Sequence, residues 1–303
     1  MGCFLRRRDL PCSCRLPNGT DDDVDPALHE LTKLSARSSK GRALILNAAV
    51  SLEQTTLAHI APHMRHLFAI GPLHAMAPAP ASSSSSLWRE DDGCLAWLDS
   101  QSDRSVVYVS FGSLTVMSHE QFRELLGGLV ATGYPFQEQD AGALQEQDAV
   151  IMAKGNHRAR IVAWAPQRDV LRHRAVGCFL THAGWNSTLE GVVEGVPMVC
   201  WPSFSDQQTN SRLVGAVWRN GLDMKDVCDG AVAERMVREA MESAEIRRAA
   251  EALVQQVKRD VAYGGSSEKE FQRLVSLITV LSTPGATELK AACTSATPGF
   301  SQQ

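Results

Sequence analysis

Two short polar segments carry side chains whose types and spacing suit a phosphorylated ligand. The segment Thr181–Ser187 reads Thr-His-Ala-Gly-Trp-Asn-Ser and joins an apolar run to a helical pattern. The N-terminus of a helix exposes unpaired N–H groups and the positive end of the helix dipole. Gly184 lets a phosphate approach the backbone, and Asn186 and Ser187 add side-chain donors. His182 stands at the end of the apolar run, where it could bond a phosphate oxygen. The local chemistry therefore predicts a diphosphate ligand.

Neighbouring side chains offer contacts for a ribose, a base and a sugar. Glu190 comes one helical turn after Ser187, and a carboxylate there can accept two hydrogen bonds from a ribose diol. Trp164 offers a flat face on which a base could stack. Asp206 and Gln207 follow another apolar run, and a carboxylate beside an amide suits the vicinal hydroxyls of a sugar.

Each of these residues also has a plainer structural interpretation. Taken alone, Trp164 would be a core aromatic and His182 a structural histidine, and only their shared context favours binding. His173, Cys178 and His182 do not predict a metal site, because Cys178 lies inside an apolar strand and no fourth ligand is near. The run Asp21-Asp22-Asp23 stands in a polar segment and is typical of solvated charge.

The elements that must position these residues alternate between strands and helices, which predicts an α/β fold with a doubly wound parallel sheet. Ligands of such sheets bind beyond the carboxyl ends of the strands. The expected strands are 42–47, 67–70, 105–111, 161–163, 177–180 and 197–200. The expected helices are 52–65, 118–131, one from about 186, one through 213–217, and 231–242, 244–262 and 267–281.

One polar repeat interrupts the alternation. Gln137-Glu138-Gln139-Asp140-Ala141 recurs as Gln145-Glu146-Gln147-Asp148-Ala149, where the pattern calls for a buried strand. The repeat predicts an exposed loop or helical turn. The sheet would then lack a central strand and leave its neighbours with unpaired backbone groups.

Composition is that of an ordinary globular protein. The 303 residues are 44% hydrophobic and 21% charged, with a net charge of −4 and no long basic stripe, so a nucleic-acid partner is not expected. No apolar run approaches the ~20 residues of a membrane helix, and Arg6-Arg7-Arg8 is too early for a signal peptide. The eight scattered cysteines favour a reducing compartment. We therefore expect a cytoplasmic monomer.

The segment from Trp164 to Gln207 resembles the signature box of plant family-1 UDP-dependent glycosyltransferases, which act on secondary products. The match needs no gap. It covers Trp164, Pro166-Gln167, His173, Gly177, Thr181-His182, Gly184 to Ser187, Glu190, Gly195 to Met198 and Asp206-Gln207. Flanking landmarks extend the resemblance over residues 42–282, except for 137–159.

The resemblance implies a UDP-glucose donor and a hydroxyl acceptor on a small hydrophobic molecule, with no metal ion or other cofactor. It places Trp164, Ala165 and Gln167 on the uridine and Glu190 on the ribose. It assigns the diphosphate to Ser113, His182, Asn186 and Ser187, and the sugar to Trp185, Asp206 and Gln207. The positive potential that a metal would supply is expected from His182 and the helix N-terminus.

The implied fold is GT-B-like, with the doubly wound sheet as a C-terminal donor domain. Residues 1–74 are interpreted as a remnant of the N-terminal acceptor domain. Residues 75–92, rich in Ala, Pro and Ser, form a linker, and residues 93–264 form the donor-binding domain. A C-terminal helix at 265–282 and a disordered tail at 283–303 complete the expected order.

One family feature has no match. Relatives carry a catalytic histidine, usually after a glycine, that deprotonates the acceptor for inverting attack on the anomeric carbon. The dipeptide Gly-His does not occur in this chain, so no catalytic residue is assigned. We therefore expect an N-terminally truncated glucosyltransferase with little activity of its own. The alternative is a catalytically inactive UDP-sugar-binding protein.

Overall fold

The computed structural model describes residues 6, 9–10, 26–76, 88–91, 93–113, 115, 117–139, 158–224 and 229–282, which divide between two compact units. The first unit takes the described residues of Met1–Arg37 and Ala77–Lys258, and the second takes those of Ser38–Met76 and Arg259–Gln303. The closing helix thus groups with residues 38–76. The expected tail, the Asp21–Asp23 run and most of the expected linker lie outside the described residues.

The first unit is built on a six-stranded parallel sheet with the order β5-β4-β3-β6-β7-β8. Its strands are β3 (Val106–Ser110), β4 (Phe136–Gln139), β5 (Ala159–Val162), β6 (Val176–Thr181), β7 (Met198–Cys200) and β8 (Gly221–Asp223). The predicted parallel α/β sheet is confirmed. The strand β8 was not predicted, because its sequence, Gly-Leu-Asp, is not an apolar run.

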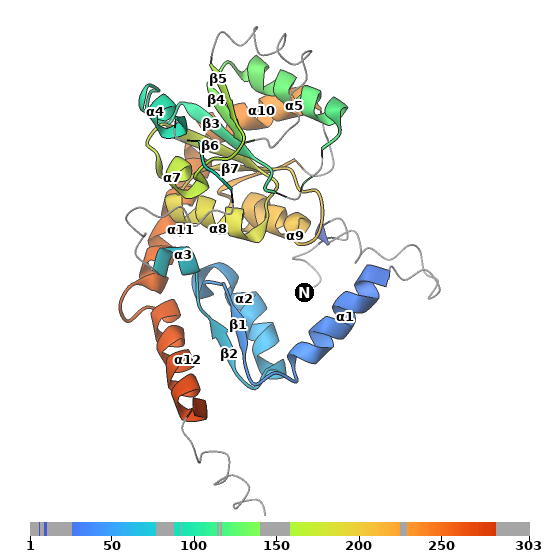
Figure 1. The fold of residues 1–303 in the computed structure, drawn as a ribbon, viewed down its shortest axis with the longest axis vertical. Helices are drawn as coiled ribbons and strands as arrows, with labels where there is room; N and C mark the ends of the chain where they lie inside the picture. The colour runs from blue at the N-terminus through green and yellow to red at the C-terminus, as the bar shows by residue number, and fades with distance from the viewer. Residues whose placement is uncertain are drawn as a thin grey trace, which may run out of the picture. The chain divides into compact units, whose positions relative to one another are not determined.

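Helices cover both faces of this sheet, as Figure 1 shows. They are α4 (Cys94–Asp99), α5 (His119–Thr132), α7 (Gln167–Arg172), α8 (Trp185–Glu194), α9 (Gln207–Arg212), α10 (Gly230–Glu242) and α11 (Ala244–Val261). A π-helical turn, Leu213–Trp218, extends α9. The helices α5 and α10 share one face, and their apolar sides form a buried cluster with β3, β4 and β6. The opposite face carries α7 and α8.

The last residues of the neighbouring strands β4, β3 and β6 are paired with one another. Ser110 of β3 pairs with Thr181 of β6 on one side and with Gln139 of β4 on the other. Strands β4 and β5 lie on one side of β3, whereas β6 and β7 lie on the other, so the chain reverses its direction of winding between β3 and β6. In open parallel sheets, the crevice at such a switch point is where ligands bind.

The first copy of the polar repeat is not an exposed loop, which corrects the sequence prediction. Residues 136–139 form the strand β4, paired in parallel with β3 and with β5. Gln137 and Glu138 are 0% and 2% exposed. Phe136 packs in the core cluster and anchors the strand, and the two ladders satisfy the backbone groups that would otherwise be unpaired. The central strand is therefore present. The second copy, residues 145–149, lies outside the described residues.

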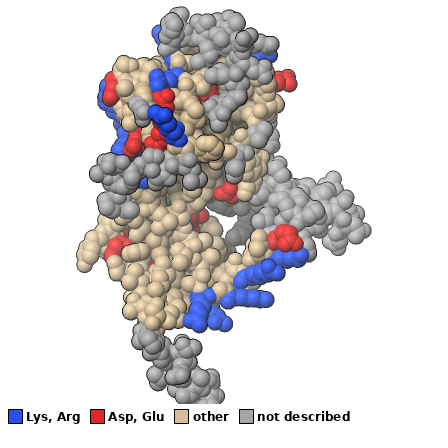
Figure 2. Space-filling view, viewed as in Figure 1, with Lys and Arg blue, Asp and Glu red and all other residues tan. Residues whose placement is uncertain are grey.

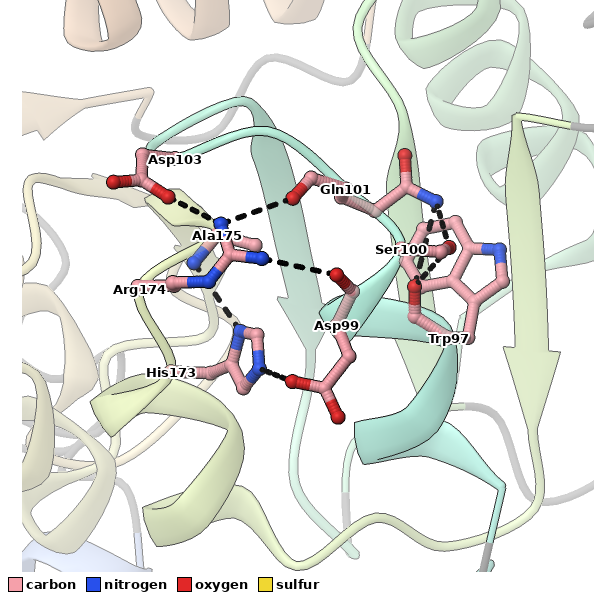
Figure 3. A network of polar contacts seen from close by, with 8 residues as sticks. All are labelled: Trp97, Asp99, Ser100, Gln101, Asp103, His173, Arg174 and Ala175. Atoms are coloured by element: carbon pink, nitrogen blue, oxygen red, sulfur yellow. Dashed lines mark hydrogen bonds and ion pairs between the residues drawn. The ribbon is translucent and has the colours of Figure 1, made fainter.

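A polar network ties the segment before β3 to the segment before β6 (Figure 3). His173 accepts a hydrogen bond at Nδ1 from the N–H of Ala175, so its Nε2 carries the proton toward Asp99 at 3.1 Å. Arg174 donates to the backbone oxygens of Asp99 and Gln101 and pairs with Asp103. This network holds the two central strands together at their amino ends.

The second unit contains a two-stranded parallel sheet. Its strands β1 (Leu44–Leu46) and β2 (Leu67–Ala69) pair in register, and the helices are α2 (Val50–Ile60), α3 (Leu73–Met76) and α12 (Ser266–Ser282). A further helix, α1 (Pro26–Ser38), precedes β1. Asp260 accepts hydrogen bonds from Ser51 and from Ser266, and the Ser267 hydroxyl donates to the oxygen of Gly71. These bonds join the C-terminal segment to the small sheet.

Charges of both signs are interspersed over the face of the first unit that Figure 2 shows. This pattern agrees with the small net charge of −4. Among the helices that the structure describes, none is long and apolar enough to pass through a bilayer.

Candidate functional site

The candidate residues follow four strands of the first unit at the same edge of the sheet. Ser113 comes shortly after β3, and Trp164, Ala165 and Gln167 come after β5. The segment His182–Ser187 follows β6, and Asp206–Gln207 follows β7. Because all these strands are parallel, their carboxyl ends lie along one edge of the sheet, the edge at which such sheets bind ligands. Ser113 is exposed in the turn after β3, beside the switch point.

The ring of His182 lies between two glycines at the switch point. A Cβ atom added to Gly112 would lie 2.8 Å from Cε1 of His182, and one added to Gly184 would overlap the same ring. Gly112 also has a φ of 72°, which other residues rarely adopt. The imidazole therefore occupies space that is open only because positions 112 and 184 have no side chains.

The surroundings of His182 favour its neutral form, which reduces the positive potential expected from this residue. Burial lowers its pKa below the ordinary value, and a hydrogen bond to the backbone of Ser110 and the charge of Asp206 only partly oppose this effect. The neutral ring can still donate one N–H to an anion. The positive potential at this point must come from the backbone.

The helix α8 begins with N–H groups that no side chain caps. Its N-cap is Gly184, which has no side chain, and the first helical hydrogen bond runs from Thr188 N to Gly184 O. Ala183, just before it, has a φ of 61°, and Asn210 holds its oxygen with a 2.9 Å hydrogen bond. The side chain of Asn186 is exposed at this helix end, so it can reach a ligand there.

Gln167 joins two candidate residues of α8. Its Nε2 donates to Oε2 of Glu190 at 2.6 Å and to Oγ of Ser187 at 3.0 Å. Burial raises the pKa of Glu190, and the bond from Gln167 opposes that shift. The remaining carboxylate oxygen of Glu190 can accept hydrogen bonds from a polyol such as ribose.

Trp164 lies beside Trp88, which the sequence analysis did not identify as a candidate residue. Its ring is half-buried and stands 6.2 Å from the ring of Trp88, tilted by 38°. Trp88 is 63% exposed. The next residue, Ala165, is buried, and its N–H donates to Oε1 of Gln139 at 3.3 Å. This hydrogen bond therefore attaches the loop that contains Trp164 to the strand β4.

The three candidates for sugar contacts are placed differently from one another. Asp206 is exposed at the start of α9, where it accepts a hydrogen bond from Asn210. Gln207 is buried, and its side-chain oxygen accepts from the N–H groups of Ser203 and Phe204. That oxygen therefore shapes the loop after β7. Trp185 is half-buried, with its ring 6.4 Å from another tryptophan ring.

Two residues of the crevice were missed by the sequence analysis. Tyr108 has its hydroxyl 3.2 Å from Oε1 of Gln139 and 3.4 Å from Oε1 of Gln167. Tyr108 stood in an apolar run that indicated only a strand, and Gln139 stood in the polar repeat. The one available signal was the alternation of strands and helices, which required a strand at the position of the polar repeat and therefore of Gln139.

Among the described residues, no group of three or more His, Cys, Asp or Glu side chains is arranged to hold a metal ion.

Comparison with known proteins adds sequence and structural similarity over most of the chain. A family model described as UDP-glucoronosyl and UDP-glucosyl transferase matches residues 44–255. The chain is 43% identical over 298 residues to 7-deoxyloganetic acid glucosyltransferase of Catharanthus roseus, covering 93% of this chain and 61% of that protein. It is 42% identical over 307 residues to myricetin 3-O-rhamnoside 1,2-glucosyltransferase of Crocosmia x crocosmiiflora, covering 98% and 62%.

The solved structure of Os79 from O. sativa in complex with UDP has a TM-score of 0.80 to this chain. The two are 31% identical, and the match covers 91% of this chain and 63% of that one. The chain thus spans about three-fifths of the length of these relatives.

Proposed function

Because the chain belongs to the UDP-glucoronosyl and UDP-glucosyl transferase family, we propose that the crevice beyond β3, β5, β6 and β7 binds UDP-glucose. The chain would thereby supply the donor site for transfer of glucose to a hydroxyl of a small hydrophobic acceptor. The observation that carries the proposal is the arrangement at the switch point. There, the uncapped start of α8 and the ring of His182 lie at the edge where the strands end.

Each part of the donor has a matching group. The uracil would stack on Trp164 beside the backbone of Ala165, and the ribose hydroxyls would bond Glu190 and Gln167. The diphosphate would accept from α8 and from His182, with Asn186, Ser187 and Ser113 adding donors. The sugar would meet the three remaining candidates, Trp185, Asp206 and Gln207.

The reaction would invert the anomeric carbon, because a single displacement by the acceptor hydroxyl replaces UDP. This step requires a general base, which typically contributes ~100- to 10,000-fold in rate. We assign that base to no residue of this chain. The part proposed for this chain is to bind the donor and to stabilise the leaving diphosphate through backbone N–H groups.

We propose that UDP binds without a metal ion, since the N–H groups of α8 supply the positive potential. Isothermal calorimetry of UDP binding, with and without EDTA, tests this. We expect equal affinities, and binding that disappears with EDTA would contradict the proposal.

A second assay separates binding from transfer. The protein is incubated with UDP-glucose and a panel of flavonoid, terpenoid and phenolic acceptors, and glucosides are measured by mass spectrometry. Glucoside formation supports transfer by this chain. UDP binding without glucoside formation would support the proposed donor site and contradict the proposed transfer activity.

A further inference from the structure

We propose that Gln139, with Tyr108, orients Gln167 so that Glu190 is set to bind the ribose of the nucleotide. This inference rests on the proposed function, because it assigns positioning residues to the same site. The polar strand β4 would then contribute to nucleotide recognition from beneath the crevice.

The orientation of the Gln139 amide is set by a backbone group that can only donate a hydrogen bond. The N–H of Ala165 can only donate, and it lies 3.3 Å from Oε1 of Gln139. The amide oxygen of Gln139 must therefore face Ala165. The same oxygen lies 3.2 Å from the hydroxyl of Tyr108, so it selects the rotation in which the one hydroxyl proton points to its side of the ring.

Tyr108 passes this orientation to Gln167. Its side chain is fully buried, stacked on Phe179 with ring centroids 5.3 Å apart, so the hydroxyl has a fixed position. Burial raises the pKa of Tyr108, so the hydroxyl keeps its proton and remains a donor. Oε1 of Gln167 lies 3.4 Å away on that side, so the proton is shared between the two amide oxygens in a three-centre hydrogen bond. The amide oxygen of Gln167 thus faces Tyr108, and its NH2 group faces α8.

The consequence reaches Glu190. With its NH2 group toward α8, Gln167 donates to Oε2 of Glu190 and to Ser187. A reversed amide would place its oxygen against the carboxylate, and two acceptors would repel each other. The observed orientation leaves the second oxygen of Glu190 for ribose hydroxyls.

The same strand offers a matched control. Gln137 has the same side chain, points to the same face as Gln139 and is fully buried. Neither Nε2 nor Oε1 of Gln137 has a hydrogen-bond partner in the described structure. If β4 acted only through packing, changing either glutamine to methionine would have the same effect on the site.

The experiment compares UDP with 2′-deoxy-UDP, because only the ribose contact distinguishes them. Affinities of both nucleotides are measured by calorimetry for the full chain and for Gln139→Met, Tyr108→Phe and Gln137→Met. We expect the wild type to prefer UDP, by on the order of 10-fold for one hydrogen bond to a carboxylate. Gln139→Met and Tyr108→Phe should reduce that preference, mainly by weakening UDP, whereas Gln137→Met should retain it.

Each outcome has a distinct meaning. A UDP preference that stays within about 2-fold of wild type in folded Gln139→Met and Tyr108→Phe would overturn the orientation of Gln167 but leave the donor site intact. Equal loss with Gln137→Met would reduce the effect to packing, and would also overturn it. No UDP binding by the wild type would overturn both proposals. Tyr108→Phe removes a single oxygen, so it carries the test if Gln139→Met does not fold.

Discussion

At the scale of single residues, the surroundings of His182 bear on its proposed role at the diphosphate. Its ring occupies the space that side chains at Gly112 and Gly184 would need, and burial lowers its pKa and so favours the neutral form. A neutral donor beside several N–H groups binds a diphosphate through directed hydrogen bonds, without the cost of burying a full positive charge. The charge balance of the site therefore depends on α8 more than on its side chains.

Replacing His182 by alanine should weaken UDP binding by roughly 1–3 kcal/mol, the value of a hydrogen bond to a charged group. Calorimetry of the His182→Ala variant measures this change. A suitable control is His173→Ala, because His173 lies at the amino ends of the strands, away from the crevice. If the two variants lost affinity equally, His182 would have no direct role at the phosphates.

At the scale of elements, the strand β4 is the clearest departure from sequence expectation. The strands β3 and β6 were predictable, because each is a continuous apolar run of the kind that lies buried on both faces. The run Gln137-Glu138-Gln139 lacks that signature. It is a strand because Phe136 anchors it and because ladders on both sides pair its backbone. Such support comes from residues distant in the chain, which local patterns do not report.

The prediction of the candidate site was limited in the same way, because local patterns do not report contacts between residues distant in the chain. The segments after β5, β6 and β7 were predictable, since strand-end and helix-start signals are local. The contacts of Tyr108 were not, because its partners Gln139 and Gln167 lie 31 and 59 positions away. Polarity alone did not reveal that one glutamine of β4 is bonded and the other is not.

Changing Gln137 to methionine should stabilise the first unit by about 1–2 kcal/mol, because an unpaired buried amide is replaced by an apolar side chain of similar length. Chemical denaturation of the wild type and the variant measures the change. Gln139→Met is the comparison, and it should not stabilise, since it removes two hydrogen bonds. A destabilised Gln137→Met variant would show that the amide has a partner, such as a bound water molecule.

At the scale of the whole molecule, the chain contains two units whose stabilities need not respond equally to conditions. The first has a large apolar core shared by helices and the central strands. The second has a small core and a two-stranded sheet, which is marginal unless other elements cover it. Unfolding of the second unit should therefore respond to changes in conditions that leave UDP binding at the proposed donor site unaffected.

Glu53 gives the second unit a specific pH dependence. Burial raises its pKa from 4.5 to about 7. Between those values the carboxyl is protonated when folded and ionised when unfolded, so its contribution is present below pH 4.5 and is lost as pH rises through about 7. Glu53→Gln should remove this dependence. Thermal unfolding from pH 5 to pH 8 compares the two proteins, and identical slopes would contradict the assignment.

The packing of His182 against its two glycines has a consequence for how the chain can be varied. Gly184 has an ordinary negative φ of −59°, and the three atoms nearest to where its methyl group would go all belong to the imidazole of His182. Alanine at 184 would therefore clash with the ring of His182, and removing that ring would relieve this clash. Positions 182 and 184 are thus epistatic. Gly184→Ala should therefore be tolerated better in a His182→Ala background than in the wild-type chain.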